Sequence, residues 1–116
     1  MARLAAVRRT PEDLVALDQA LDARTTAWRA GDAATFIEVD VVFHQSVVAA
    51  AHNRILAELY ADFSTALRSS LTDSIGTDLA PERWVDHGRL VEAIRAGDPD
   101  RAAHEAGAYL EAPAAE

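Results

Sequence analysis

The sequence predicts an all-α fold, an antiparallel bundle of about six helices, and three observations lead to this prediction. Apolar residues recur at spacings of three and four along most of the chain, the period of a helix that buries one face. No segment shows the sustained period-two alternation of a half-buried strand. The apolar segments are separated by turn signals, of which "RAGDAAT" and "RAGDPDR" repeat one device, a Gly stop followed by an Asp cap.

The first half of the chain carries clear helix boundaries. The opening "RLAAVRR" is helical in character, and we expect it to be the remainder of a truncated first helix. At "TPED", Thr10 is the expected N-cap of the next helix and Pro11 its first residue, followed by acids at the positive end of the helix dipole. Gly31 ends that helix, and Asp32 caps a third one that is expected to reach about Ala51.

The fourth helix is expected to begin after Asn53, a favourable N-cap residue, and to bury one leucine-rich face. It leads into the only extended loop that the pattern predicts, "TDSIGTDLAP" at 72–81. Pro81 is then expected to open a fifth helix, with His87 at the centre of its apolar stripe.

The C-terminal part of the domain is marked by a second break. The turn "GDPD" at 97–100 ends the fifth helix, and Pro99 starts the last one, which is expected to end near Ala112. Residues 113–116 are expected to form a frayed tail. The sequence therefore predicts a single helical domain over residues 1–112.

Composition excludes several classes of function. The 116 residues carry a formal net charge of -8 with no Lys, so the chain lacks the basic surface that binds nucleic acid. Cysteine is absent, which excludes disulfides and thiolate sites. We expect no signal peptide and no membrane span, hence a cytoplasmic protein. Without a serine elbow or a Gly-rich phosphate loop, the chain is not expected to be an enzyme.

A carboxylate interrupts the apolar face of the third helix. On a helical wheel Asp40 lies among Phe36, Phe43 and Val47, and His44 follows one turn later at the edge of the same face. A carboxylate in a core is costly unless something pairs with it. Residues four apart can both reach one ion, as the histidines of H-E-x-x-H do. The alternatives are a buried Asp–His hydrogen bond or an ion pair between Asp40 and an arginine.

His87 is the second polar residue expected in the core, between Trp84 and Leu90 on its own helix. A lone histidine on an apolar face is usually a core residue with satisfied hydrogen bonds. Bundles nevertheless build metal sites from ligands that project inward from facing helices. Asp40, His44 and His87 together would suit Zn²⁺, Ni²⁺ or Mn²⁺, with a fourth position either closed by another ligand or open to a small molecule.

The remaining polar candidates are weaker. His52, at a helix end, and His104 are both expected to face solvent. Tyr109 shares a face with Ala102 and should point inward, where a core tyrosine with a hydrogen-bonded hydroxyl is the simpler interpretation. Arg68, at the edge of the fourth helix's stripe, is either a solvated arginine or an anchor for a ligand carboxylate.

Four separated blocks of the chain match, in the same order, the motifs of one known domain family. The segment "VDVVFHQSVVAAAHNRIL" carries the D-x₂-F-H motif and the Asn that follows it in that family. "DHGRLVEAIRAGDPDRAAHEAGAYL" is similar to the family's closing motif. "RRTPEDLVALDQALD" and "WRAGDAATFIEVD" are similar to its earlier helices. Together these blocks resemble the FadR C-terminal (FCD) domain, the effector-binding domain of the FadR subgroup of GntR-type transcription regulators.

The resemblance implies a bundle in which one Asp and three His hold a divalent metal that helps to bind a small carboxylate effector. Asp40, His44 and His87 match three of these ligands. The fourth is expected 22 residues after His87, where this sequence has Tyr109, a possible ligand or effector contact. Two further residues are candidate effector contacts, Asn53 and Arg68.

The resemblance also suggests what the whole protein does. Such regulators bind DNA through an N-terminal winged helix-turn-helix, which this sequence lacks. We therefore expect a ligand-sensing domain of a bacterial regulator, a homodimer that reaches DNA only through a head outside this chain. Two other functions stay open: a metal-dependent hydrolase or lyase with an open three-ligand site, and a metal-free structural dimerisation module.

Overall fold

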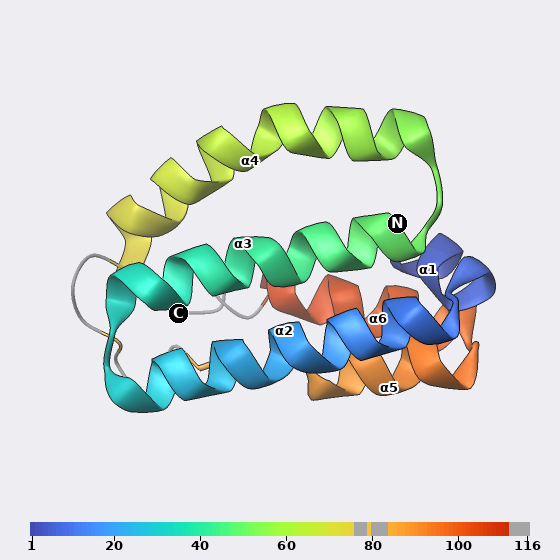
Figure 1. The fold of residues 1–116 in the computed structure, drawn as a ribbon, viewed down its shortest axis with the longest axis horizontal. Helices are drawn as coiled ribbons and strands as arrows, with labels where there is room; N and C mark the ends of the chain where they lie inside the picture. The colour runs from blue at the N-terminus through green and yellow to red at the C-terminus, as the bar shows by residue number, and fades with distance from the viewer. Residues whose placement is uncertain (76–78, 80–83, 112–116) are drawn as a thin grey trace.

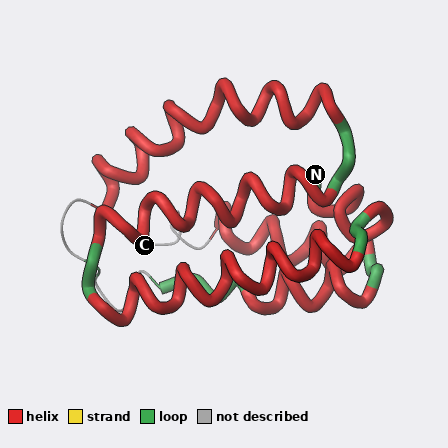
Figure 2. Tube along the Cα trace, in the orientation of Figure 1, coloured by secondary structure: helices red, strands yellow, loops and turns green. Residues whose placement is uncertain are grey.

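The computed structural model describes the backbone of residues 1–75, 79 and 84–111 and the side chains of residues 1–73, 79 and 84–107. Within this part of the chain the structure has six helices and no strand, which confirms the all-α prediction (Figure 2). In chain order the helices are α1 (Ala2–Arg8), α2 (Pro11–Ala30), α3 (Ala33–Ala50), α4 (Arg54–Ile75), α5 (Gly88–Ala96) and α6 (Pro99–Glu111). The tail predicted at 113–116 lies outside the described residues.

The central helix of the bundle is α3. It packs against α2 on one side and α4 on the other, and its C-terminal half also meets α1 (Figure 1). The helices α1, α5 and α6 pack against one another, and α5 also contacts α2. Among the described elements, α4 has an extensive contact with α3 alone. Different faces of α3 therefore contact three of the other five described helices.

The predicted boundaries of α2 and α3 are confirmed by their caps. The Thr10 hydroxyl accepts a hydrogen bond from the Asp13 amide at 3.2 Å, and the Asp13 carboxylate accepts one from the Thr10 amide at 2.8 Å. This reciprocal capping box satisfies two amides that the helix leaves unpaired. Gly31 ends α2 in the left-handed conformation at φ 71°, and Asp32 caps α3 by accepting from the Thr35 amide.

The predicted start of the long loop is wrong, because α4 continues to Ile75 instead of ending before residue 72. The Thr72 hydroxyl donates to the Arg68 carbonyl at 2.9 Å, a bond to the preceding turn that lets a threonine remain helical. The polar residues after Leu71 thus continue the helix, although their composition favours a loop.

The predicted start of α5 is also wrong. Residues 84–87 are not helical, and α5 begins at Gly88 with His87 as its N-cap residue. The Asp86 carboxylate accepts a hydrogen bond from the Gly88 amide at 2.9 Å, a local turn that competes with helix formation. Pro81, the expected first residue, lies outside the described residues. His87 is thus presented at a helix start rather than from the middle of a helical stripe.

The hydrophobic core lies where α1, α5 and α6 meet α3 and the first half of α2. The largest completely buried side chains among the described residues are Phe43, Leu17, Leu90, Ile94, Val41 and Val91, and all but Val41 belong to this core. The short helix α1 joins this core through Ala5 and Ala6, whose small side chains allow its backbone to come close. Phe43, the residue before His44, belongs to this core, so His44 lies next to it in the chain.

The outer side of α4 carries an exposed apolar stripe. Ile55, Leu59 and Phe63 follow one another at intervals of four residues, and each exposes more than half of its surface. This exposure follows from the position of α4, whose extensive contacts are to α3 alone among the described helices.

The helix α3 is long and apolar enough to be a candidate membrane span, although none was expected from the sequence. The helix spans 18 residues with a mean hydropathy of 1.3, so by length and composition it could cross a membrane. Half of it is buried inside the bundle, however, which is the behaviour of a core helix.

We expect the stability of the domain to depend on the buried face of α2 and little on the outer face of α4. Leu17→Ala should lower the free energy of unfolding by about 2–5 kcal/mol, because it leaves a cavity at a fully buried position. Leu59→Ala, the same change at a residue 61% exposed, should alter it by less than about 0.5 kcal/mol. Urea denaturation of both variants tests this, and equal losses would contradict the placement of the core.

Candidate metal centre

The structure brings Asp40, His44 and His87 into one cluster. Each offers a ligand atom, and these atoms all lie within 4.8 Å of one another. The His44 Nε2 atom is 3.6 Å from Asp40 Oδ2, and His87 Nε2 is 3.7 Å from Asp40 Oδ1. Asp40 and His87 are buried, whereas His44 is partly exposed. The three residues that the sequence singled out therefore form a single group at the edge of the core.

Packing holds the two imidazoles beside one another. The ring of Phe43 lies 5.5 Å from the ring of His44 and 5.1 Å from that of His87, centroid to centroid. The two histidine rings are 5.4 Å apart in an edge-to-face arrangement. Because Phe43 is completely buried, it fixes both rings without adding a polar group.

A fourth residue, Arg24 on α2, also belongs to this cluster. Its Nε atom donates a hydrogen bond to Asp40 Oδ1 at 2.7 Å, and its Nη1 atom donates to the Val85 carbonyl at 2.9 Å. Both charged side chains are buried. The ion pair with an arginine, one of the alternatives that the sequence left open for Asp40, is therefore present beside the two histidines.

Aromatic rings enclose the guanidinium of Arg24. Its central carbon lies 5.0 Å from the centroid of Phe36 and 4.8 Å from that of Trp84. Cations are attracted to the faces of such rings, and the attraction grows when water is excluded. The sequence contained a signal for this residue, because Arg24 continues the spacing of three and four set by Leu21 and Trp28 on the buried face of α2.

The surroundings give Asp40 and His87 the protonation states that a metal requires. Burial opposes the charge on Asp40, but the hydrogen bond and charge of His44 together with Arg24 outweigh it and lower the pKa of Asp40 to about 2. Burial, aided by the positive charge of Arg24, lowers the pKa of His87 to about 3. At neutral pH Asp40 is a carboxylate and His87 a neutral imidazole, as metal ligation demands.

The donor set fits a divalent ion. A carboxylate oxygen carries two lone pairs, so Asp40 can ligate an ion while Oδ1 accepts the bond from Arg24. One carboxylate and two imidazoles are typical ligands of zinc and of related transition metals. Arg24 meanwhile orients Asp40 as hydrogen-bonding partners commonly orient metal ligands. The group of Asp40, His44 and His87 could therefore hold a metal.

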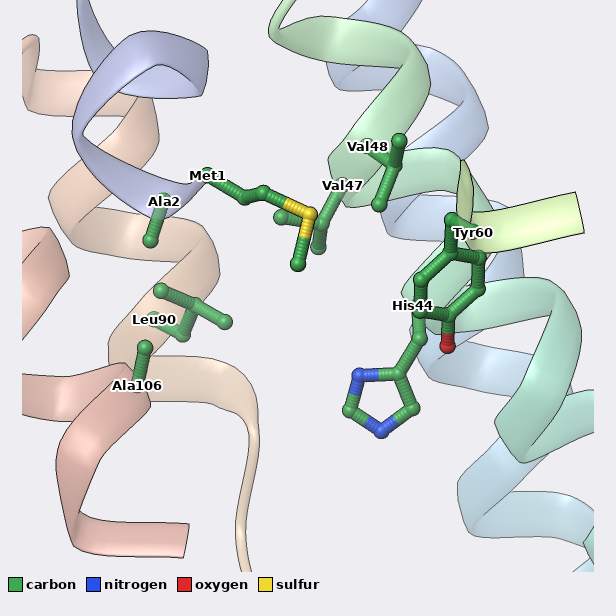
Figure 3. Close-up of a pocket in the computed structure, with 8 residues that line it drawn as sticks. All are labelled: Met1, Ala2, His44, Val47, Val48, Tyr60, Leu90 and Ala106. Atoms are coloured by element: carbon green, nitrogen blue, oxygen red, sulfur yellow. The ribbon is translucent and has the colours of Figure 1, made fainter. Parts of the chain in front are cut away.

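A pocket of about 260 Å³ adjoins the cluster, and His44 belongs to both. Figure 3 shows His44 and Tyr60 on one side of this pocket, facing Leu90 and Ala106 across it. The Tyr60 hydroxyl is buried and has no hydrogen-bond partner in the described part of the chain. Burial and the nearby negative charge of Asp40 raise the pKa of Tyr60 to about 12. It is therefore a neutral phenol with a proton to donate into the pocket.

Comparison with known proteins identifies the family of the chain. The model of the FCD domain matches residues 1–112. The chain belongs to the FCD domain family. It is also 32% identical over 104 residues to the galactonate operon transcriptional repressor of Escherichia coli (strain K12). That alignment covers 88% of the chain but 44% of the repressor, so the chain spans less than half the length of this relative. The six-helix fold is consistent with membership of this family.

The other candidate residues of this FCD domain lie at different places. Asn53 caps α4, because its Oδ1 atom accepts a hydrogen bond from the Leu56 amide at 3.1 Å. Arg68 donates to Glu38 at 2.6 Å on the surface. Neither is among the described residues that line the pocket. Tyr109 lies on α6, but its side chain is outside the described part, so its role as a fourth ligand stays a prediction.

The two remaining histidines are exposed, as expected. His52 follows α3 and pairs with Asp13 at 2.6 Å, joining the end of α3 to the start of α2. His104 lies on the exposed side of α6. Neither residue approaches the group formed by Asp40, His44 and His87 closely enough to belong to it.

The FCD domain should lose stability when a metal-free sample is acidified. The pKa of His87 falls from the ordinary 6.5 to about 3 on folding, so between these values the unfolded chain binds more protons than the folded one. Stability is therefore complete above pH 6.5 and decreases as the pH falls toward 3. Asp40 adds to the loss between its ordinary pKa of 3.8 and about 2.

Urea denaturation in chelator at a series of pH values measures this effect. His87→Gln should flatten the decline below pH 6.5, whereas His104→Gln, which removes an exposed histidine, should leave it unchanged. An unchanged pH profile in His87→Gln would show that His87 is not the buried neutral group responsible.

Proposed function

We propose that this chain is the ligand-sensing domain of a bacterial transcription regulator and binds a small carboxylate effector through a divalent metal. The observation that carries this proposal is the position of His44, which is both a candidate metal ligand and part of the pocket wall. A ligand in the pocket would therefore lie next to the ion. Membership of the FCD domain family supports this assignment.

The residues divide the work of binding. Asp40, His44 and His87 would hold the ion, which would supply a positive centre for a carboxylate. Arg24 orients Asp40, and Phe43 fixes the two imidazoles. Tyr60 offers its buried, unpartnered hydroxyl as a hydrogen-bond donor. This donor is already removed from water, so it incurs no further desolvation cost of its own when it bonds to a ligand acceptor, and a carboxylate is a strong acceptor.

The lining suggests an effector with a largely apolar body. Of the eight lining residues in the described part, His44 and Tyr60 have hydrogen-bonding side chains, and the others are Met1, Ala2, Val47, Val48, Leu90 and Ala106. A sugar acid such as galactonate carries several hydroxyls, each costing about 1–3 kcal/mol if buried without a partner. A short aliphatic or aromatic acid fits this lining better than the sugar acid for which the Escherichia coli relative is named.

Binding could be transmitted to the rest of a regulator through α3. This helix carries two of the three candidate ligands and packs against α1, α2 and α4. An effector shifts a conformational equilibrium only by its difference in affinity for the two states. In the proposed full protein, a homodimer would couple this shift to the spacing of DNA-binding heads outside this chain. Sedimentation analysis tests the dimer directly.

The proposal of a hydrolase or lyase has less support. An open three-ligand site can activate water, but turnover also needs a base near the pocket. Tyr60 with a pKa of about 12 is a poor base at neutral pH, and no carboxylate is among the described lining residues. FCD domains of transcription regulators are typically not enzymes. A purely structural module would be indicated instead by the absence of any metal or acid binding.

Metal binding should depend on the cluster and on no other histidine. The purified domain should take up about one Zn²⁺ or Ni²⁺ per chain, and chelation should lower its melting temperature. His44→Ala should lower the affinity for the ion by at least about 100-fold, because it removes a ligand. His52→Ala, at an exposed histidine outside the cluster, should leave the affinity unchanged. Calorimetric titration measures both, and equal losses would contradict the site.

The metal-loaded domain should be stabilised by short aliphatic or aromatic acids more than by galactonate in thermal-shift assays. Tyr60→Phe should lower the affinity for the best-binding acid by about 10-fold or more, because the charged group of the ligand loses a hydrogen bond. The same variant should retain its metal and its stability, since the lost hydroxyl has no partner in the described structure. Tighter binding of galactonate, or an unchanged acid affinity in Tyr60→Phe, would contradict the proposed pocket.

A further inference from the structure

We propose that Arg24 is a built-in countercharge for Asp40 that competes with the metal ion and keeps the domain folded when no ion is bound. The inference rests on the proposed metal site and adds a residue outside the expected ligand set. It makes Arg24 a determinant of ion affinity, because the ion must bind to a carboxylate whose charge Arg24 already balances.

The two cations would act on the same carboxylate. Arg24 Nε is 2.7 Å from Asp40 Oδ1, and the candidate ligands His44 and His87 approach Asp40 from its two oxygens. The arginine and the aspartate are both buried, so little water screens their charges. A buried carboxylate without a cation is strongly unfavourable. Arg24 supplies that cation permanently, which allows the metal-free chain to fold with Asp40 ionised.

Arg24 cannot easily leave when an ion arrives. Its Nη1 atom is bound to the Val85 carbonyl, and the guanidinium lies against Phe36 and Trp84. A guanidinium does not lose its proton in proteins, so the charge cannot be removed by titration. The incoming ion must therefore bind next to a fixed positive charge.

Two opposite effects of Arg24 on ion affinity follow, and their sizes decide between them. By orienting Asp40, Arg24 should raise the affinity of the site for the ion by roughly 10- to 100-fold, as hydrogen-bonding partners of metal ligands do. The repulsion between a guanidinium and a divalent ion a few ångströms away has a larger effect. At an effective dielectric constant near 20 it should lower the ion affinity by more than about 1,000-fold. The net effect is that Arg24 lowers the affinity for the ion and stabilises the metal-free state.

The test replaces Arg24 by Met, an unbranched side chain without charge, and uses Arg29→Met as the matched control. Arg29 is on the same helix but exposed. In chelator, Arg24→Met should lower the melting temperature by about 10 °C or more, because it leaves Asp40 as an unpaired buried charge. Titration with Zn²⁺ alone should then show at least about 10-fold tighter binding than in the wild type, and saturating Zn²⁺ should restore most of the lost stability. Arg29→Met should change neither quantity.

A double variant keeps the inference testable if Arg24→Met does not fold in chelator. Arg24→Met/Asp40→Asn removes both charges, so it should be more stable than Arg24→Met in chelator and should not respond to Zn²⁺. Refolding of Arg24→Met on addition of Zn²⁺ would likewise support competition for Asp40.

The outcomes separate this inference from the proposed function. If the wild type binds Zn²⁺ and Arg24→Met binds it equally or more weakly, Arg24 only orients Asp40 and the competition is refuted, while the metal site stands. If neither protein binds Zn²⁺, both the competition and the metal-dependent function are refuted. Tighter binding in Arg24→Met supports both.

Discussion

The ion pair between Arg24 and Asp40 is the contact on which the rest of the site depends. It joins α2 to α3 in the core, and the second bond of Arg24, to the Val85 carbonyl, holds the segment that leads to His87. That segment is not helical, so it cannot rely on helical hydrogen bonds to fix its course. A buried guanidinium is expensive to leave unpaired, and each of its bonds therefore constrains its partner strongly. One side chain thus sets the relative positions of ligands that are far apart in the sequence.

Local chemistry explains which parts of this structure were predictable. The ends of α2 and α3 follow from Thr10, Gly31 and Asp32, whose preferences act on neighbouring residues, and the sequence predicted them correctly. The start of α5 was predicted too early, because Asp86 forms a turn with Gly88 that the apolar spacing does not reveal. The cluster of Asp40, His44 and His87 was predicted from polar residues at core positions and from the family motif. Arg24 stands at a core position of α2 by the same test, yet its partner depends on how two helices pack, which spacing along one helix cannot specify.

The pocket joins the least anchored helix to the most anchored one. Tyr60 lies on α4, whose extensive contacts are to α3 alone among the described helices, whereas His44 lies on α3 at the centre of the bundle. A ligand that contacts both residues would add a tie between α4 and the opposite wall formed by Leu90 and Ala106 (Figure 3). Regions held by few contacts are those whose arrangement a ligand can change at low cost. If an effector binds in this pocket as proposed, the response would therefore be expressed most easily as a displacement of α4 against α3.

Charge balance links this pocket to the ion pair. Asp40 is the sole negative group in the metal cluster, and it lies close enough to Tyr60 to raise the pKa of the phenol. Where Arg24 alone is paired with Asp40, these two charges balance each other, and an acidic ligand would gain little there. With a divalent ion added, the cluster carries a net positive charge in a buried setting, where attraction for a carboxylate is strong. If the proposed metal site is correct, the arginine that keeps the domain folded without metal would also make acid binding conditional on the ion, so that the pocket would respond to both together.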